Sequence, residues 1–154
     1  MAGGKGKGKG MAHVTRVCVI EDDADIRAVV RLLLEDDGYE VMEAADGLTG
    51  HALLRNSAER LVVVLDHHLP RMDGCDLLEI VATDTILRER HAFVFLTGSP
   101  QRAADDCGET LEDLAVPLLP KPFNIDQLLD AVAAAERRLV PVADVAPERP
   151  ERAE

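Results

Sequence analysis

The stretch Leu61-Val62-Val63-Val64-Leu65-Asp66 decides the fold of this chain. Five consecutive apolar residues end on a carboxylate, a run too short for an independent helix but long enough for a strand buried on both faces. Such a strand is typical of a parallel sheet covered by helices. Asp66 is therefore expected at the carboxyl end of a strand, where open α/β sheets bind their ligands. The alternative for a single Asp in a loop is a turn or helix-capping residue.

The composition is that of a globular domain with an acidic surface. The chain has 154 residues, a one-domain length, and 47% of them are hydrophobic. Its 17 Lys and Arg residues against 29 Asp and Glu residues leave a formal net charge of -12, which disfavours contact with nucleic-acid phosphates. No apolar stretch approaches the roughly 20 residues of a membrane span, and no signal peptide is recognised. We therefore expect a cytoplasmic protein with no nucleic-acid or membrane partner.

The chain has three cysteines, Cys18, Cys75 and Cys107. The count is odd and no two are close in sequence, which argues against a disulfide framework or a zinc site and for a reducing compartment. The sequence predicts that all three are small apolar residues of the interior, Cys18 on a strand and the other two on helices.

Two segments of biased composition flank the part of the chain that is expected to fold. Residues 1–14 include an alternating Gly/Lys segment, and residues 140–154 are rich in Pro, Ala and Glu, so we predict a flexible tail and a disordered tail. Between them, in a domain of residues 15–139, short apolar runs alternate with helical periodicity. The expected strands are 16–20, 40–44, 61–65, 91–96 and 116–119. The expected helices are 24–37, 47–56, 74–84, an irregular helix at 101–113, and 125–139.

Five strands alternating with five helices imply an α/β fold, a doubly wound five-stranded parallel sheet with helices on both faces. In the flavodoxin-like order 2-1-3-4-5, the first and third strands are neighbours and their carboxyl ends form a topological switch point. Polar residues follow the strands at this rim: Glu21, Asp22, Asp66, Thr97 and Lys121. Three crowded carboxylates repel one another unless a cation joins them, and hard oxygen ligands favour magnesium.

Four motifs in order resemble the receiver domains of two-component response regulators, including the chemotaxis regulators. They are Val19-Ile20-Glu21-Asp22-Asp23 with Arg27 in the next helix, 66–74 (Asp-His-His-Leu-Pro-Arg-Met-Asp-Gly), Leu96-Thr97-Gly98, and Lys121-Pro122-Phe123. Any one of these is weak, whereas all four at compatible spacing are specific. The resemblance covers residues 16–139.

The resemblance implies a role for each residue of the rim. Asp66 is the phosphoacceptor, Thr97 binds the phosphoryl group through its hydroxyl, and Lys121 pairs with that group. The magnesium ligands that the resemblance implies are Glu21, Asp22, Asp66 and the backbone carbonyl of His68. Each assignment agrees with the chemistry, because magnesium and a lysine offset the charges of the nucleophile and of the phosphoryl group. The resemblance further implies a cis Lys121-Pro122 peptide.

The implied function is that of a signalling switch. A sensor histidine kinase or a histidine phosphotransfer protein donates the phosphoryl group, and the chain catalyses its own phosphorylation and dephosphorylation without being an enzyme in the usual sense. Because no residues are left for an effector domain, a stand-alone receiver is expected, which acts by binding a downstream protein or by onward phosphotransfer. One alternative is a phosphatase of the haloacid-dehalogenase type, although His68 stands where that class places its second acid. Another is a receiver-fold scaffold that is not phosphorylated.

Three further residues bear on the site. His67 and His68 are adjacent, so in extended backbone their side chains are expected to point in opposite directions and not to chelate together. Leu118 lies at a fifth-strand position where many relatives carry an aromatic switch residue. The sequence therefore predicts a signal that passes mainly through Thr97 and the loop after it.

Overall fold

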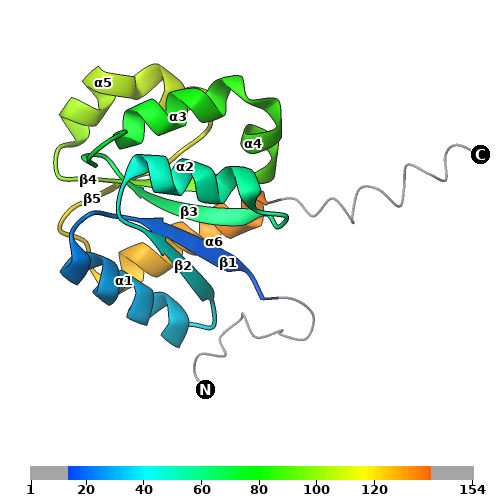
Figure 1. Ribbon diagram of the computed structural model, residues 1–154. Helices are drawn as coiled ribbons and strands as arrows, with labels where there is room; N and C mark the ends of the chain where they lie inside the picture. Colours follow the sequence, from blue (N-terminus) through cyan, green and yellow to red (C-terminus); the bar gives the residue numbers. More distant parts are fainter. Residues whose placement is uncertain (1–13, 140–154) are drawn as a thin grey trace, which may run out of the picture.

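The computed structural model of the protein describes residues 14–139, and their core is a five-stranded parallel sheet in the order β2-β1-β3-β4-β5 (Figure 1). This confirms the predicted fold class and strand order. The strands are β1 Arg16–Ile20, β2 Glu40–Ala44, β3 Leu61–Asp66, β4 Ala92–Thr97 and β5 Leu118–Pro120. The expected tails, apart from Val14, lie outside the described residues.

Helices cover both faces of the sheet (Figure 1). Helices α2, α3, α4 and α5 pack on one face, and α1 and α6 pack on the other. Their bounds are α1 Ala24–Asp36, α2 Gly47–Asn56, α3 Gly74–Thr83, α4 Thr85–Arg90, α5 Pro100–Asp113 and α6 Ile125–Arg138. None of these helices is long and apolar enough to cross a membrane.

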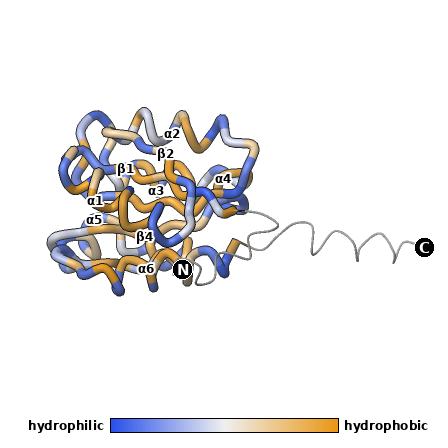
Figure 2. Tube along the Cα trace, turned by 90° about the horizontal axis from the view of Figure 1, so that it is seen from below, coloured by the Kyte–Doolittle hydropathy of each residue, from blue (hydrophilic) through white to orange (hydrophobic). Residues whose placement is uncertain are grey.

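The central strand β3 positions the rim. All six of its residues are buried, as its run of apolar side chains predicts, and the hydrophobic colouring of Figure 2 concentrates on the inner strands. In the parallel register, Ile20 of β1 lies opposite Leu65, and Asp66 lies opposite Leu96 of β4. The residues that follow β1 and the last residues of β3 and β4 therefore reach the same edge of the sheet.

The structure differs from the sequence prediction by one added helix and by a shorter fifth strand, apart from shifts of one residue at the ends of other elements. The segment after α3 forms a sixth helix, α4, because Asp84 ends α3 and its side chain caps the next helix by accepting from the Leu87 N–H. Strand β5 begins at Leu118 instead of residue 116, since it pairs only along the last residues of β4. The predicted irregularity of the helix at 101–113 is confirmed by non-helical backbone at Cys107 inside α5.

The prediction that no disulfide forms is wrong. Cys75 at the start of α3 and Cys107 in α5 are bonded through their sulfurs, with Cα atoms 5.6 Å apart, while Cys18 is free and buried in β1. The two helices pack side by side on the same face of the sheet. Residues separated by 32 positions in sequence are therefore neighbours in space.

Candidate functional site

Three carboxylates meet where β1 and β3 end. Glu21 and Asp22 follow β1, and Asp66 is the last residue of β3. One oxygen from each lies within 4.8 Å of the others. Glu21 and Asp66 are only 1% and 4% exposed, whereas Asp22 is open to solvent. The structure thus brings together the three acids that the sequence placed at this rim.

Lys121 supplies the positive charge of the cluster. Its Nζ lies 2.6 Å from Asp66 Oδ1 and donates a hydrogen bond of 3.2 Å to Glu21 Oε1. Its backbone N–H donates to the Thr97 carbonyl at 2.8 Å, so the end of β5 is fixed against the end of β4. The Lys121-Pro122 peptide is cis, as the resemblance implied.

Burial dominates the electrostatics of this cluster. It raises the pKa of the Asp66 carboxyl above its usual range, although Lys121 acts in the opposite direction. Burial also raises the pKa of Glu21, against the Asp23 N–H and the attraction of Lys121. Burial lowers the pKa of Lys121, but the two carboxylates outweigh it and the net shift is upward. Lys121 is therefore an ammonium at neutral pH, and it balances only one of three negative charges when all the acids are ionised.

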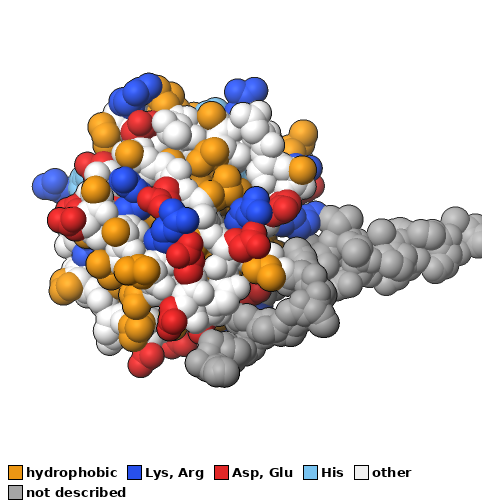
Figure 3. Space-filling model, turned by 60° about the horizontal axis from the view of Figure 1, so that its bottom comes forward, with side chains coloured by type: hydrophobic (Ala, Val, Ile, Leu, Met, Phe, Trp, Pro, Cys, Tyr) orange, Lys and Arg blue, Asp and Glu red, His pale blue; other side chains and the backbone are white. Residues whose placement is uncertain are grey.

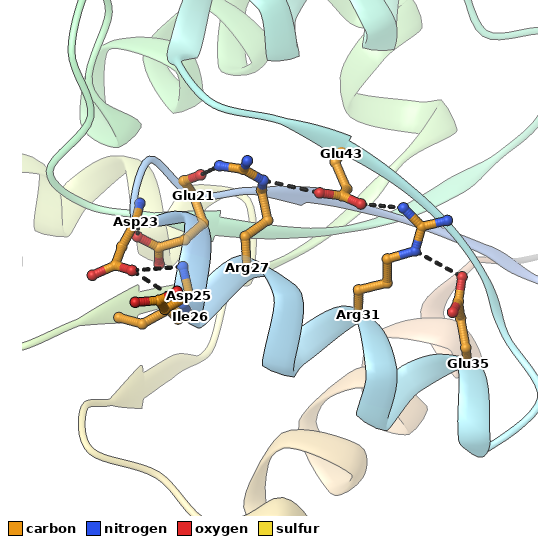
Figure 4. A network of polar contacts seen from close by, with 8 residues as sticks. All are labelled: Glu21, Asp23, Asp25, Ile26, Arg27, Arg31, Glu35 and Glu43. Atoms are coloured by element: carbon orange, nitrogen blue, oxygen red, sulfur yellow. Dashed lines mark hydrogen bonds and ion pairs between the residues drawn. The ribbon is translucent and has the colours of Figure 1, made fainter.

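A polar network along α1 holds the first loop of the site in place (Figure 4). Arg27 donates to the backbone carbonyl of Glu21 at 2.8 Å and to Glu43 of β2 at 2.9 Å. Arg31, one turn further along, pairs with the same Glu43 and with Glu35. The arginine that was part of the recognised motif thus anchors the acidic loop to the neighbouring strand.

A glycine lets α3 begin directly beneath the acceptor. A Cβ at Gly74 would lie 2.4 Å from the Asp66 carbonyl oxygen and 2.8 Å from the Phe95 ring, closer than any side chain permits. The Gly74 N–H donates instead to the His67 carbonyl at 2.9 Å, and the Asp73 side chain caps the helix. The Asp-Gly pair of the motif therefore fixes the backbone around Asp66.

The Thr97 hydroxyl lies at the end of β4 and has three partners. It donates to the Ser99 carbonyl at 3.1 Å, accepts from the Ser99 N–H at 3.0 Å, and lies 3.2 Å from Nδ1 of His67. Thr97 is 1% exposed. In this arrangement the hydroxyl is held within its own loop, and it must turn away from Ser99 to donate to a ligand.

The predicted opposite orientation of His67 and His68 is wrong. Their rings stack with centroids 4.1 Å apart, because the chain bends at these two residues instead of staying extended. His67 is buried, and its Nε2 lies 3.0 Å from Asp106 Oδ2 in α5. Sequence reasoning missed Asp106, since nothing in its spacing from the motifs indicates a contact with β3.

The donor set at the rim fits a hard divalent cation. Three carboxylate oxygens lie close enough to share one ion, and the exposed Asp22 leaves the cluster open to water. Oxygen ligands with room for water are the coordination that magnesium prefers. The charge left unbalanced by Lys121 favours the same ion.

Comparison with known proteins identifies the family. The family model described as the response regulator receiver domain matches residues 17–133. The chain belongs to this family, the signalling receivers of two-component systems. A receiver domain is a signalling module and not a conventional enzyme.

Individual relatives support this membership. Transcriptional regulatory protein PdtaR of Mycobacterium tuberculosis is 35% identical over 125 residues, which cover 80% of this chain and 57% of PdtaR. The chain spans about half the length of the curated relatives it matches. A receiver domain protein from Clostridium thermocellum has a TM-score of 0.71 at 27% identity, over 81% of this chain and 96% of that one. The fold is also shared by the receiver domain of sensor histidine kinase PA1611 from Pseudomonas aeruginosa, whose structure holds a magnesium ion in its active site cleft. The TM-score is 0.69 at 19% identity, over 80% of this chain and 98% of that one.

Proposed function

We propose that residues 15–139 form a phosphorylation-dependent switch in which Asp66 accepts a phosphoryl group from a phosphohistidine of a partner protein. The observation that carries this proposal is the contact of 2.6 Å between Lys121 Nζ and Asp66 Oδ1 inside the cluster of three acids. A buried carboxylate in contact with a lysine and next to two further acids that can hold a metal ion is suited to charge compensation at phosphorus.

In the transfer, an Asp66 oxygen attacks phosphorus while the bond between phosphorus and the partner's imidazole nitrogen breaks. The imidazole leaves with the electron pair of that bond, and an acyl phosphate forms on Asp66. Lys121 is placed to pair with the phosphoryl oxygens, at the cost of its contact with the carboxylate. Magnesium, when bound by Glu21, Asp22, Asp66 and the His68 carbonyl, supplies charge neutralisation to the phosphoryl oxygens.

Thr97 gives the switch its two arrangements. In one, its hydroxyl donates to the Ser99 carbonyl; in the other, the hydroxyl donates to a phosphoryl oxygen and the Ser99 loop follows. Gly98 between them is exposed, and a Cβ there would touch nothing within 4 Å, so the loop has space to move. Leu118 in β5 is half-buried and has no hydroxyl or ring to carry the signal.

An apolar groove beside the site suits the phosphodonor. Ile26, Val29 and Val30 of α1 and the 121–123 segment line a hollow of about 400 Å³. Lys121 belongs both to this groove and to the acid cluster, so a helix seated there brings a phosphohistidine within reach of Asp66. Figure 3 shows hydrophobic side chains among charged ones on the underside of the molecule, and Val29 is 53% exposed. The phosphoryl group of such a donor, a sensor histidine kinase or a histidine phosphotransfer protein, comes ultimately from ATP, which favours a cytoplasmic location for this protein.

The test uses acetyl phosphate and magnesium, followed by intact-mass measurement. The expected product carries one base-labile phosphoryl group, and Asp66→Asn removes it because an amide is not an anionic nucleophile. The matched control is Asp76→Asn, an exposed acid in the first turn of α3, which keeps the adduct. Full phosphorylation of Asp66→Asn would overturn the assignment. Steady hydrolysis of unrelated phosphate esters would instead identify a phosphatase.

A further inference from the structure

A second group of metal-binding atoms lies behind the acid cluster, between α3 and α5. A ring nitrogen of His67, the Cys75 sulfur and an Asp106 carboxylate oxygen lie within 4.8 Å of one another, and the Cys107 sulfur is bonded to that of Cys75. The imidazole is 1% exposed and the two cysteines 6% and 5%, whereas the Asp106 side chain is 47% exposed. The group is therefore buried but reachable from solvent on its Asp106 side.

Both ring nitrogens of His67 have polar neighbours. Nδ1 lies 3.2 Å from the Thr97 hydroxyl oxygen, and Nε2 lies 3.0 Å from Asp106 Oδ2. In the tautomer with hydrogen on Nδ1, that nitrogen donates to the Thr97 oxygen and Nε2 turns its lone pair toward the Asp106 carboxylate. In this tautomer the imidazole and the carboxylate can bind one metal ion together.

We propose that reduction of the Cys75–Cys107 disulfide creates a zinc site, in which both cysteine sulfurs, His67 Nε2 and Asp106 bind one ion. Two thiolates, an imidazole and a carboxylate are a donor set that zinc accepts, with four ligands in a tetrahedron. It differs from the all-oxygen set of Glu21, Asp22 and Asp66, which suits magnesium. Nothing in this inference depends on whether Asp66 is phosphorylated.

The dimensions of the group suit such an ion. Zinc bound at about 2.0 to 2.3 Å from each ligand places neighbouring ligand atoms about 3.3 to 3.8 Å apart. The observed separations among His67, Cys75 and Asp106 reach at most 4.8 Å, and the Nε2 to Oδ2 distance is 3.0 Å. Small side-chain rotations therefore bring these atoms to binding distance. Zinc-bound histidines use their second nitrogen as a donor, and here the Thr97 hydroxyl oxygen lies 3.2 Å from His67 Nδ1, where it can accept that hydrogen.

Disulfide and zinc exclude each other, since both use the same two sulfurs. A dithiol reductant donates two electrons and two protons, becomes a disulfide itself, and leaves Cys75 and Cys107 as thiols. Zinc then displaces both thiol protons. An oxidant of the disulfide class reverses the sequence: it takes two electrons, the bond between Cys75 and Cys107 forms again, and zinc is released. The cluster is thus a zinc site whose occupancy follows the redox state.

The test measures zinc directly on the full chain. Alkylation under denaturing conditions should count one free thiol in the oxidised protein and three after treatment with a phosphine reductant. Zinc is then titrated against a chromogenic chelator, with magnesium in excess to occupy oxygen sites. We expect one zinc per reduced chain and at least tenfold weaker binding by the oxidised chain. Cobalt in place of zinc should give a thiolate-to-cobalt charge-transfer band with the reduced chain alone.

Variants distinguish zinc binding at the proposed site from non-specific zinc binding at the surface. Asp106→Asn alters an exposed ligand and should weaken zinc binding about tenfold or more, a loss that even outer-shell partners cause. Cys107→Ser should abolish the cobalt band, with circular dichroism as the check on folding. Cys18→Ser, the matched control, should change neither reading. Stoichiometric zinc on the oxidised chain, no zinc on the reduced chain, or wild-type affinity in Asp106→Asn would overturn the proposal. These zinc measurements do not depend on the outcome of the acetyl phosphate test on Asp66.

Discussion

Opening the Cys75–Cys107 disulfide in the absence of metal should destabilise the folded domain by several kcal/mol. The bond closes a loop of 32 residues between α3 and α5. Cross-linking removes conformational entropy from the unfolded chain by a constant plus an amount that grows with the logarithm of loop length, and a loop of this size corresponds to about 3.7 kcal/mol at 25 °C. In the folded state, opening the bond changes few contacts, because both sulfurs stay buried between the helices.

Urea unfolding with and without a phosphine reductant, in the presence of EDTA, measures this difference. With a slope of about 1 to 3 kcal/mol per molar urea, the loss should lower the midpoint by about 1 to 4 M. A double variant with Cys75→Ser and Cys107→Ser should unfold near the urea midpoint of the reduced protein, and the reductant should not change its midpoint. Cys18→Ser keeps the disulfide, so its response should match that of the original chain.

Two results would refute this reasoning. The first is a count of three free thiols in denatured protein that was first treated with a disulfide oxidant, because Cys75 and Cys107 would then not form the bond. The second is a complete count of three thiols after reduction with a change in unfolding free energy below about 1 kcal/mol, far under the chain-entropy value. Adding zinc to the reduced protein should recover stability as the logarithm of zinc concentration above the dissociation constant.

Three further predictions concern the acid cluster and its output. Asp22→Asn should weaken magnesium binding and phosphorylation together by about tenfold or more, because it removes a hard anionic ligand; unchanged magnesium affinity by calorimetry would place the metal elsewhere. Without magnesium, stability should fall as pH rises from the ordinary carboxyl range through the raised pKa values of Asp66 and Glu21, since the folded protein holds protons that the unfolded chain has released. Lys121 does not alter this dependence of stability on pH, because its pKa is raised above an already basic value. Thermal melts of Asp66→Asn at several pH values should show a weaker dependence of the melting temperature on pH. Leu118→Ala should leave phosphorylation intact, and amide exchange should still change most at 97–106 on phosphorylation; loss of partner binding in this variant, with phosphorylation and stability unchanged, would make position 118 the relay.

The sequence by itself was enough to predict the sheet and its polar rim. The run from Leu61 to Leu65 indicates a strand that is buried on both faces. This pattern lies within five consecutive residues, so no knowledge of distant contacts is needed to recognise it. Asp66, Thr97 and Lys121 could be placed because parallel strands carry their carboxyl ends to one edge, whatever the exact register. At the start of α6, Asn124 and Gln127 form a capping box, a feature that sequence alone can indicate because both partners lie within one turn.

Only the tertiary structure decided what lies between the helices. The pairing of Cys75 with Cys107 depends on α3 and α5 lying side by side on one face of the sheet, and no local pattern encodes the angle between two helices. The same holds for His67, whose bend away from extended backbone turns its ring toward Asp106 and Thr97. Periodicity tells which face of an element is buried, but packing alone determines which residue of another element meets it.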